Sequence, residues 1–397
     1  MSIPAAAAIG IIAVAELFCT SLWFSANGAA AELLRGWGLP PSSVGALTSA
    51  VQGGFIFGTL AFALSNLADR VPASRIFFVS GLLGALANAL FAFGGFGFAP
   101  SLALRFADGV ALAGIYPLGM KLVVGWNRGR TADTLAVLVG MLVLGTAFPY
   151  GLRAWAPGLD WHSTVAAASL LSVVGAILVL VTGDGPDARL NTVGVHPRLG
   201  SVLQAFRVPA FRSAAFGYFG HMWELYAFWT LVPFLVAPLM PASLGPAANF
   251  GVIAAGFVGS LVAGRLARRF GSAPVAAVAL SASGTICVIY PFTAAWPDFL
   301  RLAVLVFWGA TVVADSAQFS SLSSQACSAD LIGSALAVQN AIGFAISIMS
   351  ISLVTELFGS KGEAAVTWLA LGPALGLVAM FLRGSTKLRW PKSSRYE

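Results

Sequence analysis

Two glutamates stand inside apolar stretches long enough to cross a membrane. Glu16 lies in "AELFCTSLWF" (15–24) and Glu224 in "HMWELYAFWT" (221–230). Because an ionised side chain at the centre of a bilayer costs at least ~2.5 kcal/mol, such a residue usually faces a cavity or a partner. Removal from water also disfavours the charged form, so a carboxyl there can bind and release a proton. Both residues are candidates for substrate binding or proton coupling. The alternative is that each pairs with a buried donor and locks helices together.

The spacing of the neighbouring residues predicts a polar stripe beside each glutamate. If both stretches are helical, residues at i, i+4, i+7 and i+11 share one face. The first stripe comprises Glu16, Thr20, Trp23 and Asn27, and the second comprises Gly217, His221, Glu224 and Phe228. We expect the first stripe to line a cavity next to Glu16, with Glu224 facing the same site from the other half of the chain.

Three further charged residues fall inside apolar segments. Arg105 and Asp108 are three residues apart on one predicted helix, where they can neutralise each other. Alternatively, they take part in substrate binding or proton coupling. Asp315 shares a predicted helical face with Trp308, Thr311 and Gln318. This face is easier to explain by a wet cavity than by lipid.

Histidine and aromatic residues beside Glu224 allow two interpretations each. His221 is one turn before Glu224 and could titrate with it near neutral pH, or it could be a structural hydrogen-bonding neighbour. Trp23, Tyr226 and Trp229 could stack on a flat or cationic ligand, or they could pack the helices.

The composition predicts a polytopic membrane protein. Of 397 residues, 58% are hydrophobic and 9% charged, against about 25% charged in an ordinary soluble domain. The net charge of +7 comes from residues scattered through short loops and the tail, which does not favour nucleic-acid binding. The three cysteines suggest neither a disulfide framework nor a metal site.

Runs of about 20 apolar residues predict an all-α protein with twelve transmembrane helices. The expected segments are 4–27, 43–64, 74–96, 101–125, 131–154, 163–183, 213–238, 247–267, 273–295, 300–322, 332–357 and 363–382. The first lacks a basic region and a cleavage site, so we expect it to be retained as a span. A polar stretch divides the chain into a six-helix bundle (1–183), a central loop (184–212) and a second six-helix bundle with a basic tail (213–397).

The distribution of Lys and Arg predicts the orientation. With the N-terminus inside, sixteen of these residues lie in the cytoplasm and four outside, while Arg105 and Lys121 lie within a helix. By the positive-inside rule, both termini are expected on the cytoplasmic side. We expect a multi-pass protein of the cytoplasmic (inner) membrane.

Two loop motifs at equivalent places in the halves resemble a known family. "SNLADRVPASR" (65–75) resembles the G-x-x-x-D-R-x-G-x-[RK]-[RK] loop of the major facilitator superfamily in Asp69, Arg70 and Arg75, and "GRLARRFGS" (264–272) resembles it in Arg269, with Arg268 in place of the aspartate. The resemblance implies two bundles related by a pseudo-two-fold axis, which rock about a central site. It also implies that Asp69, Arg70, Arg268 and Arg269 belong to gating loops. Asp69 would contact the opposite bundle as an inner-gate residue, or act as a local cap.

The fourth predicted span resembles the same family in "RFADGVALAGIYP" (105–117). The resemblance implies that Arg105 modulates the proton affinity of a neighbouring carboxylate or binds an anionic substrate. "AGIYPLGMK" (113–121) is similar to the cyanate and nitrate permease-like branch, which implies a small anion with Arg105 and Lys121 as contacts. The excess of buried acids instead favours export of a cationic or neutral compound. Symport and antiport stay open.

The leading functional prediction is a secondary active transporter of a small solute, coupled to protons and working by alternating access. No G-x-x-x-x-G-K-[ST] loop is present, so the chain is not expected to use ATP, and no cofactor is indicated. The chain has three scattered histidines and no hydrolase signature, which argues against an enzyme. A receptor of transporter fold that binds without transporting is the alternative from a different class. The expected partners are the substrate, protons and lipid, and we expect a monomer.

Overall fold

The computed structural model describes residues 3–65, 67–126, 131–188, 205–327 and 332–381. No strand occurs in these ranges, and every predicted segment corresponds to a helix or a broken helix. The helices of the first half are α1 (Ala5–Thr20), α2 (Ser25–Gly28), α3 (Ala30–Trp37), α4 (Ser42–Ser65), α5 (Leu67–Arg70), α6 (Ala73–Phe93), α7 (Phe98–Ala113), α8 (Tyr116–Trp126), α9 (Thr131–Trp155) and α10 (Trp161–Thr182). Those of the second half are α12 (Pro209–Val236), α13 (Gly245–Phe270), α14 (Ser272–Ile289), η2 (Tyr290–Thr293), α15 (Asp298–Ala314), α16 (Ser316–Gln325), α17 (Ile332–Lys361), η3 (Gly362–Ala370) and α18 (Leu371–Phe381).

The described residues form an all-α polytopic membrane protein. Nine helical segments among them are long and apolar enough to cross a membrane, and α1 is a shorter apolar helix. The ninth of these segments, Ala335–Phe381, covers most of α17 together with η3 and α18, which correspond to the last predicted span. α12 is not among them although it has 28 residues, because Arg212, His221 and Glu224 lower its apolar character.

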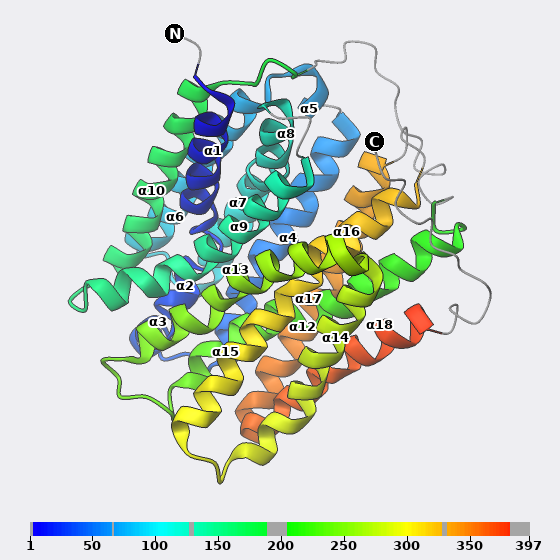
Figure 1. Cartoon of the computed structure of the whole chain (residues 1–397). Helices are drawn as coiled ribbons and strands as arrows, with labels where there is room; N and C mark the ends of the chain where they lie inside the picture. The colour runs from blue at the N-terminus through cyan, green and yellow to red at the C-terminus, as the bar shows by residue number, and fades with distance from the viewer. Residues whose placement is uncertain (1–2, 66, 127–130, 189–204, 328–331, 382–397) are drawn as a thin grey trace.

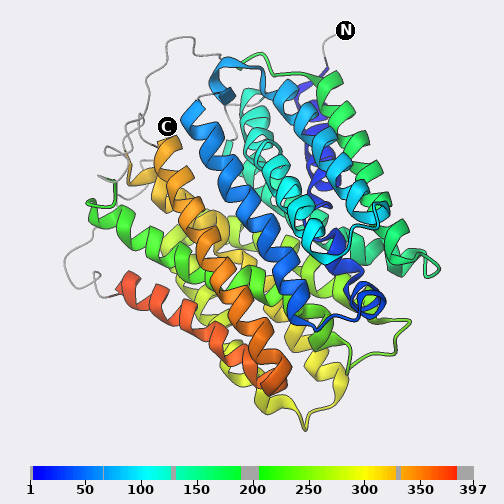
Figure 2. The ribbon, with the colours of Figure 1, turned by 180° about the vertical axis from the view of Figure 1, so that it is seen from behind.

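The two halves lie side by side and meet along two pairs of helices (Figure 1). α4 packs against α17, and α9 packs against α13. Figure 2 shows α4 and α17 next to each other at this boundary. Exchanging the halves exchanges the second span with the eighth and the fifth with the eleventh, so one contact becomes the other. The contact pattern therefore has the two-fold character expected of repeated halves.

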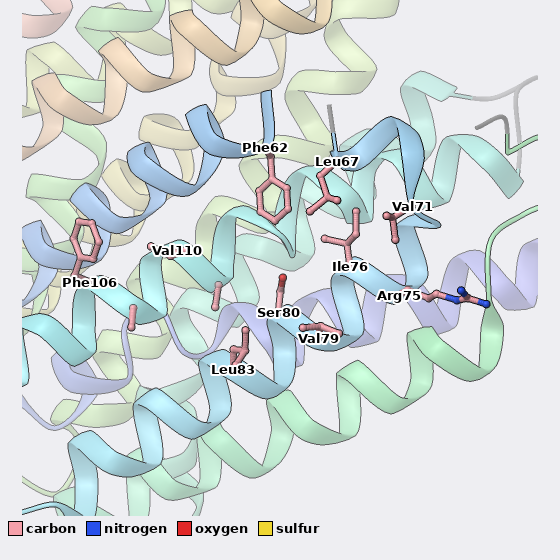
Figure 3. Close-up of a pocket in the computed structure, with 12 residues that line it drawn as sticks. Phe62, Leu67, Val71, Arg75, Ile76, Val79, Ser80, Leu83, Phe106 and Val110 are labelled. Carbon is pink, nitrogen blue, oxygen red and sulfur yellow. The ribbon is translucent and has the colours of Figure 1, made fainter. Parts of the chain in front are cut away.

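Within each half, one pair of helices crosses so closely that only glycine fits. A Cβ atom at Gly109 on α7 would collide with the Val51 carbonyl of α4. At the equivalent crossing of the second half, a Cβ atom at Gly309 on α15 would collide with the Val252 carbonyl of α13. Small residues permit such backbone contact in membrane helices. α6 lies on the other side of α7 from α4 (Figure 3).

Three predicted spans are interrupted rather than continuous. The first ends its α-helix at Thr20 and turns before α2, the fourth breaks between α7 and α8, and the tenth breaks at Asp315 between α15 and α16. The first break corrects the expectation of one helical stripe from Glu16 to Asn27. The third corrects the expectation that Asp315 shares a continuous helical face with Thr311 and Gln318.

Two helices of the first half begin at a carboxylate that accepts hydrogen bonds. The Asp160 carboxylate accepts a hydrogen bond of 2.8 Å from the Ser163 amide and caps α10. Hydrogen bonds from Ser163 lower the pKa of Asp160. Asp184, just after α10, accepts bonds from the Ala73 amide (2.9 Å) and the Ser74 hydroxyl (2.5 Å). The end of α10 thereby caps the start of α6.

Candidate functional site

Six aromatic side chains from both halves meet where the halves join. This central aromatic cluster consists of Trp23, Phe24, Phe55, Tyr226, Trp229 and Phe344, all at most 4% exposed. Trp23 of the first half stacks on Tyr226 (ring centroids 5.6 Å apart) and on Phe344 (5.7 Å) of the second. Phe55 and Phe344 lie 4.5 Å apart. The cluster is therefore shared between α4, α12, α17 and the break that follows α1.

Buried polar atoms in and beside this cluster have no hydrogen-bond partner among the described residues. They include the indole Nε1 atoms of Trp23 and Trp229 and both amide atoms of Gln52; both amide atoms of Gln339, five residues before Phe344 on α17, also have no partner there. Gln52 lies one turn before Phe55 on α4, and its side chain is fully buried. Buried polar groups are normally hydrogen-bonded. A group of such atoms at one inter-helical centre is suited to a polar ligand.

Glu16 lies on α1, seven residues before Trp23, and is fully buried. Neither carboxyl oxygen has a partner among the described residues. The carboxyl packs directly against Gly119 of α8, where a Cβ atom would collide with it. Tyr116 is close enough to interact electrostatically with Glu16 and with Tyr218 of the second half. Glu16 is thus next to the boundary between the halves.

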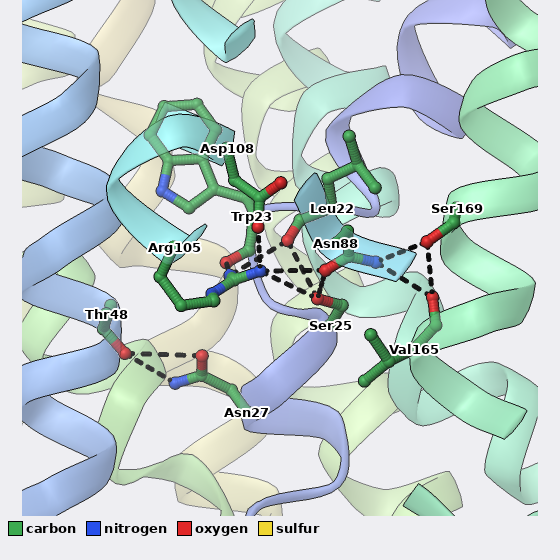
Figure 4. Close-up of polar contacts among 10 residues, drawn as sticks. All are labelled: Leu22, Trp23, Ser25, Asn27, Thr48, Asn88, Arg105, Asp108, Val165 and Ser169. Atoms are coloured by element: carbon green, nitrogen blue, oxygen red, sulfur yellow. Dashed lines mark hydrogen bonds and ion pairs between the residues drawn. The ribbon is translucent and has the colours of Figure 1, made fainter. Parts of the chain in front are cut away.

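Arg105 is held by acceptors from three helices and from the break after α1 (Figure 4). Its guanidinium donates to Asp108 (2.7 Å) and to Asn88 (3.0 Å). It also donates to the backbone carbonyls of Leu22 (3.0 Å) and Trp23 (2.7 Å), which the break removes from helical bonding. Irregular backbone at membrane depth requires such replacement partners. The local-neutralisation interpretation of Arg105 and Asp108 describes this geometry.

Asn88 extends the Arg105 network to α10. Its carbonyl oxygen accepts bonds from Arg105 and, at 2.7 Å, from Ser25 of α2. Its amide nitrogen donates to the Val165 carbonyl and the Ser169 hydroxyl, both at 2.9 Å. The network therefore fixes the break after α1 to α6, α7 and α10 within the first half.

Glu224 faces into the second half rather than toward Glu16. Its carboxylate accepts hydrogen bonds from the Trp308 indole (2.6 Å), the Ser283 hydroxyl (2.8 Å) and the Cys287 thiol (3.3 Å). These donors lie on α15 and α14. The expectation that Glu224 and Glu16 face one shared site is corrected, because neighbouring helices decide which face of α12 is polar.

His221 and Asp315 form a second buried pair in the same half. The Nδ1 atom of His221 lies 2.7 Å from Oδ1 of Asp315, at the break between α15 and α16. Asp315 is also close enough to Glu224 for their charges to interact. The partner of His221 is thus Asp315, whereas sequence reasoning paired it with Glu224.

The other predicted lining residues are distributed around the centre. Thr20 donates to the Glu16 carbonyl at 2.7 Å, and Asn27 donates to Thr48 of α4 at 2.9 Å. Gln318 is 4% exposed on α16. Lys121, in the middle of α8, donates to the Ala68 carbonyl of α5, and this contact does not involve Arg105.

A comparison with models of protein families identifies the family of this chain. The model of the Major Facilitator Superfamily matches residues 12–351, which is most of the chain. The chain belongs to the Major Facilitator Superfamily. The comparison with individual curated proteins gave no match. Members of this superfamily are membrane transporters, so the chain is a membrane transporter with its candidate site between two halves.

The loop residues that the superfamily resemblance singled out are only partly described. The side chain of Asp69 lies outside the described residues, while Arg70, Arg268 and Arg269 are exposed. Arg269 lies over the ring of Phe270, 5.2 Å from its centroid. The gating role of these residues stays a prediction.

Sequence analysis did not identify five residues of the candidate site. They are Phe24, Phe55, Phe344, Gln52 and Gln339. The glutamines could have been found, since each is an uncharged polar residue inside an apolar segment. The phenylalanines could not, because the chain contains 29 of them and nothing local distinguishes those at the centre.

Proposed function

We propose that the chain is a secondary active transporter that binds a small solute at the central aromatic cluster and moves it by alternating access. The observation that carries this proposal is that Trp23, Tyr226 and Phe344 stack across the boundary between the halves. A solute held there would contact both halves at once. Rocking of the halves would then break one set of contacts and expose the solute to the other side of the membrane.

The chemistry of the centre favours a neutral or cationic organic solute with a flat apolar part. Aromatic faces attract cations, and the nearby Glu16 is acidic. The anion alternative needs Arg105 and Lys121, but Arg105 is bonded to Asp108 and to the α1 break, and Lys121 is bonded to Ala68. No observation favours the cyanate and nitrate permease-like branch.

Proton coupling is the second part of the proposal, and Glu16 is its proposed carrier. The Glu16 carboxyl has no donor among the described residues and lies on α1, the helix that leads to Trp23, so it can hold a proton while the centre is closed. Glu224, by contrast, has three donors. One charge moved across 100 mV supplies ~2.3 kcal/mol, enough to drive accumulation.

The proposed location is the cytoplasmic membrane with both termini inside. The excess of Lys and Arg in the loops on that side supports this orientation. It places the start of α4 and the end of α17 on the outer side.

The test uses purified protein in liposomes containing a pH-sensitive dye, with tetraphenylphosphonium as an aromatic cation and benzoate as an aromatic anion. We expect the cation, and not the anion, to drive proton movement and to raise the Tm of the detergent-solubilised protein. Glu16→Gln should abolish the proton movement and keep the Tm shift. Both probes also cross a bare bilayer, so proton movement is counted only above that of protein-free liposomes. Such movement with benzoate alone would support the anion alternative, and a Tm shift without any flux would support the receptor alternative.

A further inference from the structure

An apolar groove of about 660 Å³ lies on the first half, and no residue of the central aromatic cluster lines it (Figure 3). Its volume is within the range of small-molecule sites. Phe62 and Leu67 line one side and Ile76, Val79 and Leu83 line the other. Val79 is 52% exposed and Leu83 is 58% exposed, so the groove opens outward on the apolar surface that a membrane protein presents to lipid.

The groove exists because α4 and α6 both pack against α7. Ala107, Val110 and Ala111 of α7 line its floor. These side chains are shorter than that of Phe106, which also lines the groove from α7, and shorter than most of the side chains from α4, α5 and α6 that form the walls. We call this feature the α7 groove.

One end of the α7 groove is positively charged. Arg75 lines it at the start of α6, and the exposed Arg70 lies at the end of α5 next to the lining residue Val71. No ion pair or hydrogen bond of the Arg75 guanidinium occurs among the described residues. Asp184, which follows α10, is already bonded to the Ser74 hydroxyl and the Ala73 amide.

We propose that the α7 groove binds one anionic phospholipid of the cytoplasmic leaflet. An acyl chain lies along the apolar floor, and the phosphate is held by Arg75 with Arg70 beside it. Basic sites between membrane helices on the cytoplasmic side are suited to anionic headgroups. A guanidinium that has no partner among the described residues stands at one end of a lipid-facing apolar trough. This arrangement matches the charged headgroup and the apolar chain of a phospholipid. This inference goes beyond the transport proposal: the choice of leaflet rests on the proposed orientation, whereas the binding of the lipid does not.

The experiment is native mass spectrometry of the full-length protein in detergent, titrated with dioleoyl phosphatidylglycerol. We expect one lipid to be retained, and phosphatidylcholine to be retained less. Arg75→Gln should lower the retained fraction about fivefold, the loss expected for one basic residue near an anionic membrane surface. Val79→Trp fills the groove and should lower it at least as much. Leu83→Trp is a second filling variant in case Val79→Trp does not fold.

Two control variants separate the groove from general charge and general apolar surface. Leu86 is 57% exposed on the same face of α6, two turns beyond Val79 and outside the groove. Arg265 is exposed at the end of α13 in the other half. Leu86→Trp and Arg265→Gln should retain the lipid as wild type does. The proposal is overturned if these controls lose as much lipid as the groove variants, or if phosphatidylcholine is retained equally well.

Discussion

At the scale of single residues, the buried charges fall into two kinds. Arg105 and Glu224 are surrounded by partners of their own half, whereas Glu16 has none among the described residues. Satisfied charges hold helices together, because separating them would leave a bare charge in an apolar interior. A carboxyl without partners contributes no such contact. We therefore expect variants of the two kinds to differ in stability and in coupling.

Arg105→Leu should lower the stability by about 3–5 kcal/mol, because it leaves Asp108 buried without its partner. The double variant Arg105→Leu/Asp108→Leu should recover part of this loss, since no bare charge remains. Thermal unfolding in detergent measures both. A single variant as stable as wild type that no longer binds tetraphenylphosphonium would instead assign Arg105 to the substrate.

Glu224→Leu should lower the free energy of unfolding by about 1–3 kcal/mol, because the Trp308 and Ser283 donors lose their acceptor. Glu16→Leu should be no less stable than wild type. The same unfolding measurement compares the two at one pH. Equal losses in both variants would mean that Glu16 has a structural partner and is not free to exchange a proton.

Sequence reasoning could find these charged residues but not their directions. Glu16, Glu224 and Asp315 stand out because charge is costly in an apolar segment. Which way each points depends on the helices packed around it, and Asp315 lies at a helix break that its local sequence does not mark. The partners Trp308 and Ser283 are 84 and 59 residues away from Glu224, so no local pattern could pair them.

At the scale of helices, the close crossings and the breaks determine how the helices of each half pack against one another. The α4–α7 and α13–α15 crossings bring backbones into contact through Gly109 and Gly309. The lengths of the apolar runs predicted the positions of the helices well; α10, for example, begins at Trp161 where residue 163 was expected. It could not predict the breaks, since the residues around Thr20 are as apolar as those of a continuous span.

Gly309→Ala should lower the stability by about 1–3 kcal/mol, because the added methyl group overpacks the crossing against Val252. Gly251→Ala is the matched control, since nothing lies within 4 Å of a Cβ atom there. It should be neutral or stabilising by roughly 0.5–1 kcal/mol. Chemical unfolding in mild detergent compares the pair, and a Gly309→Ala protein as stable as the control would refute the close crossing.

At the scale of the whole molecule, the halves are closed together at the end where α4 begins and α17 ends. Phe234 of α12 packs against Ala30, Leu34 and Val44 of the first half. The ideal Cβ position of Gly45 lies 3.1 Å from the Thr355 Cβ atom of α17. Alternating access requires this end to open during the cycle.

Gly45→Cys/Thr355→Cys, made in a Cys327→Ser background, should form a disulfide, because the Cβ separation is only slightly below the usual 3.5–4.5 Å. The oxidised protein should lose transport and regain it after reduction. Flux of tetraphenylphosphonium into liposomes, above that of protein-free liposomes, measures this, with each single cysteine variant as a control. Full transport by completely crosslinked protein would show that the halves do not separate here.

The polarity of α12 has a consequence for biosynthesis. A helix enters the membrane from the translocon according to its own apolar character, and α12 carries Arg212, His221 and Glu224. Ser283 and Trp308, which donate hydrogen bonds to Glu224, are synthesised later. We expect a nascent chain ending at 271 to leave α12 poorly inserted and one ending at 325 to insert it, as glycosylation-site mapping would measure. Assembly of the second half therefore has to proceed as a group of helices rather than one span at a time.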